Sequence, residues 1–209
     1  MKKGKLIVIE GIYGTGKLAV NLAETLRNAL TSQGKEVYEI DSPDSGRAML
    51  MGAQDLDCGW RYGLFRADFF YELASRARAC SVIRDELQAG KVVLCKNFTL
   101  SSIAYAGIKG HDWFREDLNC LEAGARGLNF GGEVSPDLTI YLDLAPEVAI
   151  EKLESRIEGL FTPDDIHLQA ACFKEELSKL PKEKVGIISA AKSDEDVAAE
   201  ALALIAKIV

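Results

Sequence analysis

The sequence predicts an α/β fold, a three-layer α/β/α sandwich with a five-stranded parallel sheet, formed by residues 1–209 as a single domain. Short apolar runs rich in valine and isoleucine recur along the chain, as is typical of strands that are buried on both faces of a parallel sheet. Segments with apolar residues at helical spacing separate these runs, which implies βαβ units with right-handed crossovers. A chain of 209 residues is long enough for one well-packed domain and too short for two full-sized ones.

The first expected elements are a strand at 5–9 and, after several glycines, a helix that ends at Gly34. A second strand follows at 35–40. A long helix is expected at 62–89, because no proline interrupts this segment and Gly90 stops it.

The remaining elements alternate in the same way. They are a strand at 91–95, the start of a Ser/Thr-rich helix, an irregular glycine-rich stretch at 107–135, a strand at 139–144, a helix from Pro146 to about Arg156, a strand at 185–189 and a helix at 194–208. We expect Asp143 to cap the helix that begins at Pro146.

Composition excludes several classes of protein. Lys and Arg total 25 against 32 Asp and Glu, and this net charge of −7, without a dense basic run, argues against nucleic-acid or anionic-membrane partners. The 5 cysteines form no Cys-x-x-Cys pair, so neither a disulfide framework nor a zinc site is expected. No apolar run approaches the roughly 20 residues of a membrane span. We therefore expect a reduced, cytoplasmic protein.

A phosphate-binding loop is expected between the first strand and the first helix. The spacing Gly-x-x-x-x-Gly-Lys, in this strand-to-helix context, brings backbone N–H groups and a lysine ammonium to an anion at a helix N-terminus. The residues expected to hold the nucleotide phosphates are Gly11, Gly14, Thr15, Gly16, Lys17 and Leu18.

One position departs from this motif. Leu18 stands where a serine or threonine hydroxyl normally binds Mg²⁺, and an aliphatic side chain cannot coordinate a cation that takes oxygen ligands. Phosphate binding by Lys17 and the loop is therefore expected without a metal ligand from the loop.

Three segments resemble the thymidylate kinase family, in the family's order and at its separations. They are Ile9-Glu-Gly-Ile-Tyr-Gly-Thr-Gly-Lys17, Leu100-Ser-Ser-Ile-Ala-Tyr-Ala-Gly107 and Ser135-Pro-Asp-Leu-Thr-Ile-Tyr-Leu-Asp-Leu-Ala-Pro-Glu147. The resemblance implies a P-loop nucleoside monophosphate kinase fold. It also implies a homodimer that transfers the γ-phosphoryl group of ATP to dTMP with Mg²⁺.

The resemblance assigns roles to the residues that match the family's motifs. Lys17 matches the phosphate-loop lysine, and Glu10 matches the acidic residue that precedes the loop. Asp44 lies in what resembles the proline turn near the monophosphate. Arg76 matches an arginine that reads the thymine, and Tyr105 matches a tyrosine beside the deoxyribose.

The 62–89 helix carries two stripes at helical spacing. One stripe consists of Phe65, Phe69, Glu72 and Arg76, and the other of Phe70, Leu73, Ala77 and Cys80. Two interpretations of the first stripe stay open. Either Phe69 or Phe65 lies near a base, or both phenylalanines pack in the core or at a dimer interface.

The departures from the family concentrate on the chemistry. Tyr13 replaces an acidic residue that faces the acceptor sugar, and Glu72 replaces a thymine-stacking phenylalanine. Lys96 and Asn97 replace the Asp-Arg pair next to the metal and both phosphates. Of the family's arginine-rich lid, this sequence retains only Arg156. We expect Arg156 and Lys17 to be the two catalytic cations.

These departures leave two functions open. The first is a slow or altered kinase that uses ATP, with Mg²⁺ binding in doubt because an ammonium replaces an aspartate beside the ion. The second is a nucleotide-binding protein without turnover, a regulatory or heteromeric partner of an active kinase.

Overall fold

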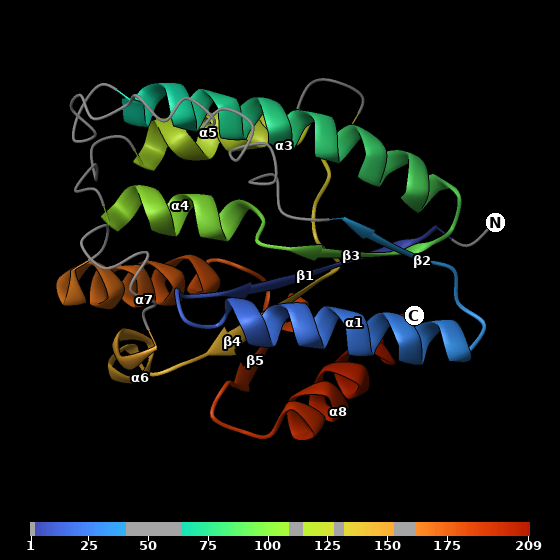
Figure 1. Cartoon of the computed structure of the whole chain (residues 1–209). Coiled ribbons are helices and arrows are strands. Elements are labelled where there is room, and N and C mark those ends of the chain that lie inside the picture. Colours follow the sequence, from blue (N-terminus) through green and yellow to red (C-terminus); the bar gives the residue numbers. More distant parts are fainter. Residues whose placement is uncertain (1–2, 41–63, 109–114, 128–131, 153–161) are drawn as a thin grey trace, which may run out of the picture.

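The computed structural model describes residues 3–40, 64–108, 115–127, 132–152 and 162–209. A parallel sheet forms its centre, with the strand order β2-β3-β1-β4-β5 (Figure 1). The strands are β1 (Lys5–Gly11), β2 (Val37–Ile40), β3 (Val92–Lys96), β4 (Leu138–Asp143) and β5 (Val185–Ser189). The predicted five-stranded parallel sheet is confirmed.

Strand β1 occupies the middle of the sheet because its side chains are apolar on both faces. It pairs with β3 from Lys5 to Ile9 and with β4 from Ile7 to Gly11. Since successive side chains point to opposite faces, Ile7 and Ile9 contribute to one buried cluster. Leu6 and Val8 contribute to another.

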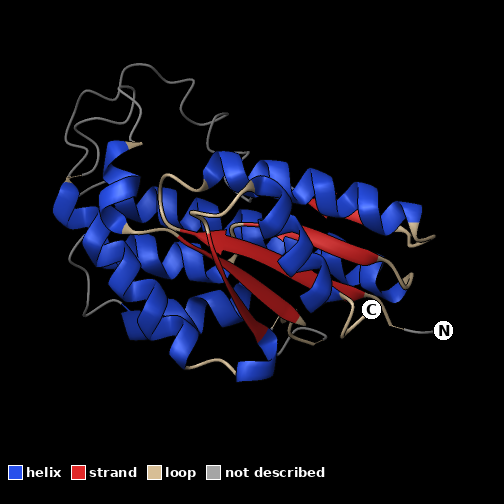
Figure 2. Ribbon diagram, turned by 90° about the horizontal axis from the view of Figure 1, so that it is seen from below, coloured by secondary structure: helices blue, strands red, loops and turns tan. Residues whose placement is uncertain are grey.

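Helices cover both faces of this sheet (Figure 2). The helices in the described ranges are α1 (Gly16–Ser32), α3 (Leu64–Gln88), α4 (Thr99–Ile108), α5 (Arg115–Ala125), α6 (Pro146–Glu151), α7 (Pro163–Ser178) and α8 (Asp194–Ile205). One 3₁₀ turn, Lys182–Lys184, precedes β5. Helices α1 and α8 lie on one face, and α3 and α5 lie on the other (Figure 1). The three-layer sandwich is thus confirmed.

Several predicted boundaries agree with the structure. Gly34 and Gly90 follow the ends of α1 and α3 with φ angles of 79° and 86°, which glycine adopts readily. Asp194, Glu195 and Asp196 form the acidic first turn of α8.

Other expectations were wrong. Helix α5 lies within the stretch that we expected to be irregular, and α7 was not anticipated. Asp143 does not cap α6, because the N-cap residue is Ala145 and no side chain caps that helix. In the ranges that the structure describes, no helix is long and apolar enough to cross a membrane.

Candidate functional site

The phosphate loop leaves the carboxyl end of β1, the central strand, and leads into α1. Ligands of open α/β folds bind outside this edge of the sheet. Helices α4, α6 and α7 lie at the same end of the molecule, beside the loop (Figure 1). The loop therefore occupies the place in the fold where a nucleotide site is expected.

The loop closes on itself through Thr15. The Thr15 hydroxyl donates a hydrogen bond to the Ile12 carbonyl over 2.7 Å. A Cβ atom on Gly11 would lie 2.5 Å from Thr15 Oγ1, closer than real Cβ atoms approach. Glycine is therefore required at position 11, because any larger residue would collide with the Thr15 side chain.

The first turn of α1 has the chemistry of an anion site. Thr15 is the N-cap residue, but its side chain makes no capping hydrogen bond, and the first turn carries no acidic residue. The N–H groups at the start of a helix lack intrahelical acceptors and favour an anion. Lys17 is exposed in this turn and can add a full positive charge. The arrangement fits a nucleotide phosphate.

Two helices contact the outer side of the loop. The Tyr13 N–H donates to Gln169 Oε1 of α7 over 2.9 Å. Gly14, with a φ of 92°, lies against α6, so that an added Cβ would be 3.1 Å from Ala149 Cα. The loop backbone is thus held at positions 13 and 14 by segments far away in the sequence.

Tyr13 and Leu18 contribute apolar surface. Both side chains are partly buried and pack against the larger hydrophobic core. Leu18 therefore replaces a hydroxyl ligand with a packing contact, in agreement with its aliphatic character. Tyr13 likewise contacts the core at the position where the family has an acidic residue.

Lys96 forms an ion pair on the sheet. Its Nζ lies 3.1 Å from Glu39 Oε1 of the neighbouring strand β2, and the Lys96 side chain is only 13% exposed. Arg27 of α1 lies 3.8 Å from the other Glu39 oxygen. The charge of Lys96 is thus partly compensated by Glu39.

Asn97 follows β3 directly and has a left-handed conformation with a φ of 55°. Asparagine tolerates that conformation better than most residues. Its N–H donates to the Ile9 carbonyl over 2.9 Å, which ties the end of β3 to β1. The sequence did not predict this backbone role.

Glu10 is buried directly before the loop. One carboxylate oxygen accepts the Phe98 N–H over 3.0 Å, and the other accepts the Ser101 hydroxyl. Burial raises the pKa of Glu10 from 4.5 to about 7, although the two hydrogen bonds and the nearby Arg76 act in the opposite direction. Glu10 therefore titrates near neutral pH.

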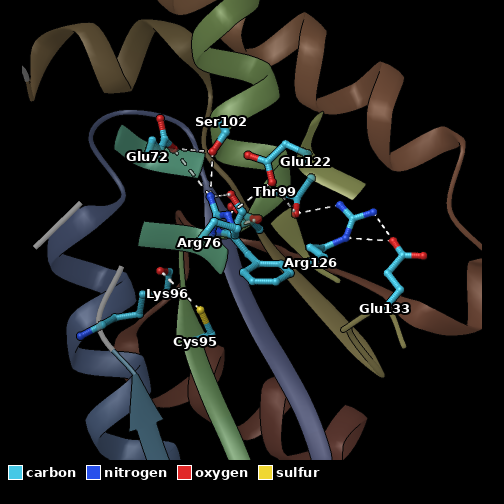
Figure 3. Close-up of polar contacts among 11 residues, drawn as sticks. Glu72, Arg76, Cys95, Lys96, Thr99, Ser102, Glu122, Arg126 and Glu133 are labelled. Carbon is cyan, nitrogen blue, oxygen red and sulfur yellow. Dashed lines mark hydrogen bonds and ion pairs between the residues drawn. The ribbon is translucent and has the colours of Figure 1, made fainter. Parts of the chain in front are cut away.

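Arg76 is the centre of a buried polar network (Figure 3). Its side chain is 1% exposed, and Nη2 donates to the Phe98 carbonyl over 3.0 Å and to the Ser102 hydroxyl over 2.7 Å. The guanidinium carbon lies 4.7 Å from the centre of the Phe98 ring, a cation–π contact. Ser102 in turn donates to Glu72.

Glu122 of α5 also belongs to this network, and no sequence pattern pointed to it. It is fully buried, and its Oε2 lies 3.4 Å from Arg76 Nε. Nε and Nη1 of Arg76 and Oε1 of Glu122 have no hydrogen-bond partner among the described residues. These atoms could hydrogen-bond to a ligand or water that offers both a donor and an acceptor.

The structure describes the remaining predicted site residues only in part. Tyr105 is half-buried on α4, and the backbone of Phe69 belongs to α3, but its side chain lies outside the described part. Asp44 and Arg156 lie outside the described residues.

The residues beside the loop bear on a protein-ligated Mg²⁺, which takes oxygen ligands. Leu18 offers no oxygen, and Lys96 brings a positive charge. Both oxygens of Glu10 already accept hydrogen bonds. In the ranges that the structure describes, no three His, Cys, Asp or Glu residues gather as a metal site.

Comparison with known proteins identifies relatives along most of the chain. A family model described as "Thymidylate kinase" matches residues 9–201. A thymidylate kinase of Desulfovibrio desulfuricans is 32% identical, with 91% of this chain and 90% of that protein aligned. A thymidylate kinase of Solidesulfovibrio magneticus is 29% identical, with 97% and 99% aligned. One from Buchnera aphidicola is 31% identical, with 76% and 73% aligned.

Proposed function

Because this chain belongs to the thymidylate kinase family, we propose that it binds ATP through the loop around Lys17 and phosphorylates dTMP or a related nucleoside monophosphate slowly. The first turn of α1 contains Lys17, carries no acidic residue and has no side-chain cap, and these features support nucleotide binding. We propose a slow rate because Leu18 and Lys96 occupy positions where the family has residues that bind or adjoin the metal ion.

The observation that carries this proposal is the environment of Leu18 and Lys96. Leu18 packs against the core, and Lys96 forms its ion pair with Glu39. Replacing a carboxylate by an ammonium reverses an interaction worth about 4 kcal/mol per unit charge at ~4 Å and an effective dielectric near 20. Phosphoryl transfer relies on such charge neutralisation, and one aimed arginine can contribute about 10³- to 10⁵-fold in rate.

The acceptor side of the proposed site includes Arg76, Glu72 and Tyr105. Nη1 of Arg76, a donor without a hydrogen-bond partner among the described residues, supports a role in reading a base edge. Glu72 lies 3.6 Å from Arg76 Nη2 and contributes a carboxylate where the family has a stacking ring. Asp44, Phe69 and Arg156 remain predicted members of the site.

A second candidate function is nucleotide binding without turnover, in a regulatory or heteromeric partner of an active kinase. The ion pair of Lys96 with Glu39 favours this candidate, because it reduces the positive charge that Lys96 could offer to a phosphate.

The test is an ADP-release assay with a panel of nucleoside monophosphates, with calorimetry of nucleotide binding. Lys17→Ala should weaken ATP or ADP binding at least tenfold, or ~1.4 kcal/mol. Leu18→Ser, Lys96→Asp and Asn97→Arg together should raise dTMP phosphorylation well above that of the parent, whereas single changes should do little because the groups act as a unit. Glu24→Gln, an exposed change on α1, serves as the control.

The outcomes separate the candidates. Equal affinity of the parent and Lys17→Ala would contradict nucleotide binding at the loop. A parent that turns over at an ordinary kinase rate would contradict both the slow kinase and the inactive partner. No turnover of the parent with any acceptor, together with ATP binding, would favour the partner function.

The same assay tests the dependence on Mg²⁺. We expect ATP affinity to change less than tenfold between excess chelator and excess Mg²⁺ at matched ionic strength, since the loop lacks its hydroxyl ligand. A tenfold or larger gain on adding Mg²⁺ would contradict the proposed loss of the metal site.

We also propose a cytoplasmic homodimer with nucleotides as its partners. Among the described residues, Cys80, Cys95 and Cys120 form no disulfide, which is compatible with a reducing compartment. Light scattering after size-exclusion chromatography would measure the assembly.

A further inference from the structure

A side chain of α7 accepts a hydrogen bond from the backbone of the phosphate loop. Neither the sequence motif nor the resemblance accounts for this contact. Gln169 Oε1 accepts the Tyr13 N–H over 2.9 Å, across 156 positions of the sequence. Tyr13 is the third residue of the loop and lies in the turn that precedes the first N–H groups of α1.

We propose that Gln169 is a positioning residue that holds the backbone of the phosphate loop in its nucleotide-binding conformation. This inference rests on the proposed binding of a nucleotide at the loop. Gln169 acts through Tyr13 and is not itself assigned a contact with the nucleotide.

The burial of Gln169 supports this role. The residue is 5% exposed and lies on the face of α7 that also buries Ile166 and Phe173. A buried amide is unfavourable unless it makes hydrogen bonds. Because a backbone N–H only donates, the carbonyl oxygen of the amide must face Tyr13, which fixes the orientation of the side chain.

The contact acts together with the packing of α6. Gly14, the next residue, lies against the backbone of Ala149, so the loop is held from two helices at consecutive positions. The hydrogen bond from Thr15 to Ile12 holds it from within. These contacts leave little freedom to the segment that sets the direction of the following N–H groups. Anion binding by backbone N–H groups depends on their convergence.

The test uses variants of the full chain that change the side-chain amide of Gln169. Gln169→Met keeps the length of the side chain and removes the carbonyl, whereas Gln169→Glu keeps an acceptor oxygen. The matched control is Glu176→Met in the same helix, because Glu176 is also 5% exposed but pairs with Lys179 over 2.7 Å. The readouts are hydrogen exchange of the Tyr13 amide and calorimetry with ADP.

In Gln169→Met we expect faster exchange of the Tyr13 amide and about fivefold weaker ADP binding, within the range of a neutral hydrogen bond. Gln169→Glu should keep the amide protected, and Glu176→Met should change neither readout. If Gln169→Met does not fold, Gln169→Asn replaces it. Its side chain is one methylene shorter, which withdraws the acceptor, so the expectation is the same.

Unchanged protection of Tyr13 in Gln169→Met would overturn the contact. Faster exchange with unchanged ADP affinity would overturn the positioning role. A parent that does not bind ADP would overturn the proposed function. The exchange of the Tyr13 amide does not depend on ADP, so it would still show separately whether Gln169 holds the loop.

Discussion

Glu10 combines full burial with two hydrogen bonds at the point where the central strand meets the phosphate loop. Burial disfavours the ionised form more than the Phe98 N–H and the Ser101 hydroxyl favour it, so the pKa of Glu10 rises to about 7. The folded chain therefore holds a proton on Glu10 at pH values where the unfolded chain, with a pKa near 4.5, has released it.

This difference predicts a pH-dependent stability. The contribution of protonated Glu10 is complete below about pH 4.5 and is lost as the pH rises through about 7. We expect the free energy of unfolding to contain a contribution that falls by roughly 3 kcal/mol across this window. Glu10→Gln, which keeps an acceptor and a donor, should remove that contribution.

Urea unfolding at several pH values between 5 and 8 measures the effect. Glu24→Gln, at a side chain that is 63% exposed, is the control and should keep the slope of the parent. The same pH slope in Glu10→Gln as in the parent would show that another group titrates in this range.

At the level of single residues, the sequence predicted the loop better than its surroundings. Gly11 and Lys17 follow a local spacing that requires no knowledge of the fold. The partner of Lys96 is Glu39, which lies on a neighbouring strand and 57 positions away, so its identity depends on strand order. The role of Gln169 could not be predicted from the sequence either, because its contact with Tyr13 depends on the packing of α7 beside the loop.

At the level of elements, α3 shows how one charged residue can displace an expected apolar stripe. The sequence predicted a stripe that included Ala77, but Ala77 is exposed and its neighbour Arg76 is buried. The guanidinium is surrounded by Glu10, Glu72 and Glu122, with contributions from β1, α3 and α5. Among the described residues, Arg76 thus faces more carboxyl groups than one positive charge can neutralise.

This imbalance predicts unequal effects of mutation. Arg76→Met should reduce the free energy of unfolding by about 3 to 5 kcal/mol, because it leaves buried carboxylates without a counter-charge. Glu122→Gln should cost less, about 1 to 2 kcal/mol, because Glu72 stays beside the arginine. Denaturant unfolding of both variants and of the double variant measures the difference. A larger loss for Glu122→Gln than for Arg76→Met would contradict this account.

The elements that sequence patterns missed have physical reasons for being missed. Helix α7 begins with a capping box between Thr162 and Asp165, a signal that was available. Its buried face nevertheless includes Gln169 and Glu176, which break the apolar period. Helix α5 spans only 11 residues, and its buried face includes the charged Glu122. Strands β1 and β3, by contrast, were predictable because their apolar runs are continuous.

At the level of the whole molecule, the contacts between distant segments predict cooperative unfolding. The larger core cluster includes residues of α1, α7, α8 and the central strands, so no helix of this group can separate without exposing it. We expect far-UV circular dichroism and the loss of ADP binding to follow one transition in urea. Two separated transitions would contradict the single domain of residues 1–209.

The central place of β1 also determines when this protein can fold during its synthesis. Lys5 pairs with Val92 and Ile7 with Leu138, so both neighbours of the strand are made long after it. Synthesis proceeds at about 5 to 20 residues per second. The two edges of β1 therefore stay unpaired for many seconds on the ribosome before β3 and β4 have been made. Exposed strand edges promote association between chains. The nascent chain should therefore depend on chaperones that shield short apolar segments until Asp143, the end of β4, has left the exit tunnel.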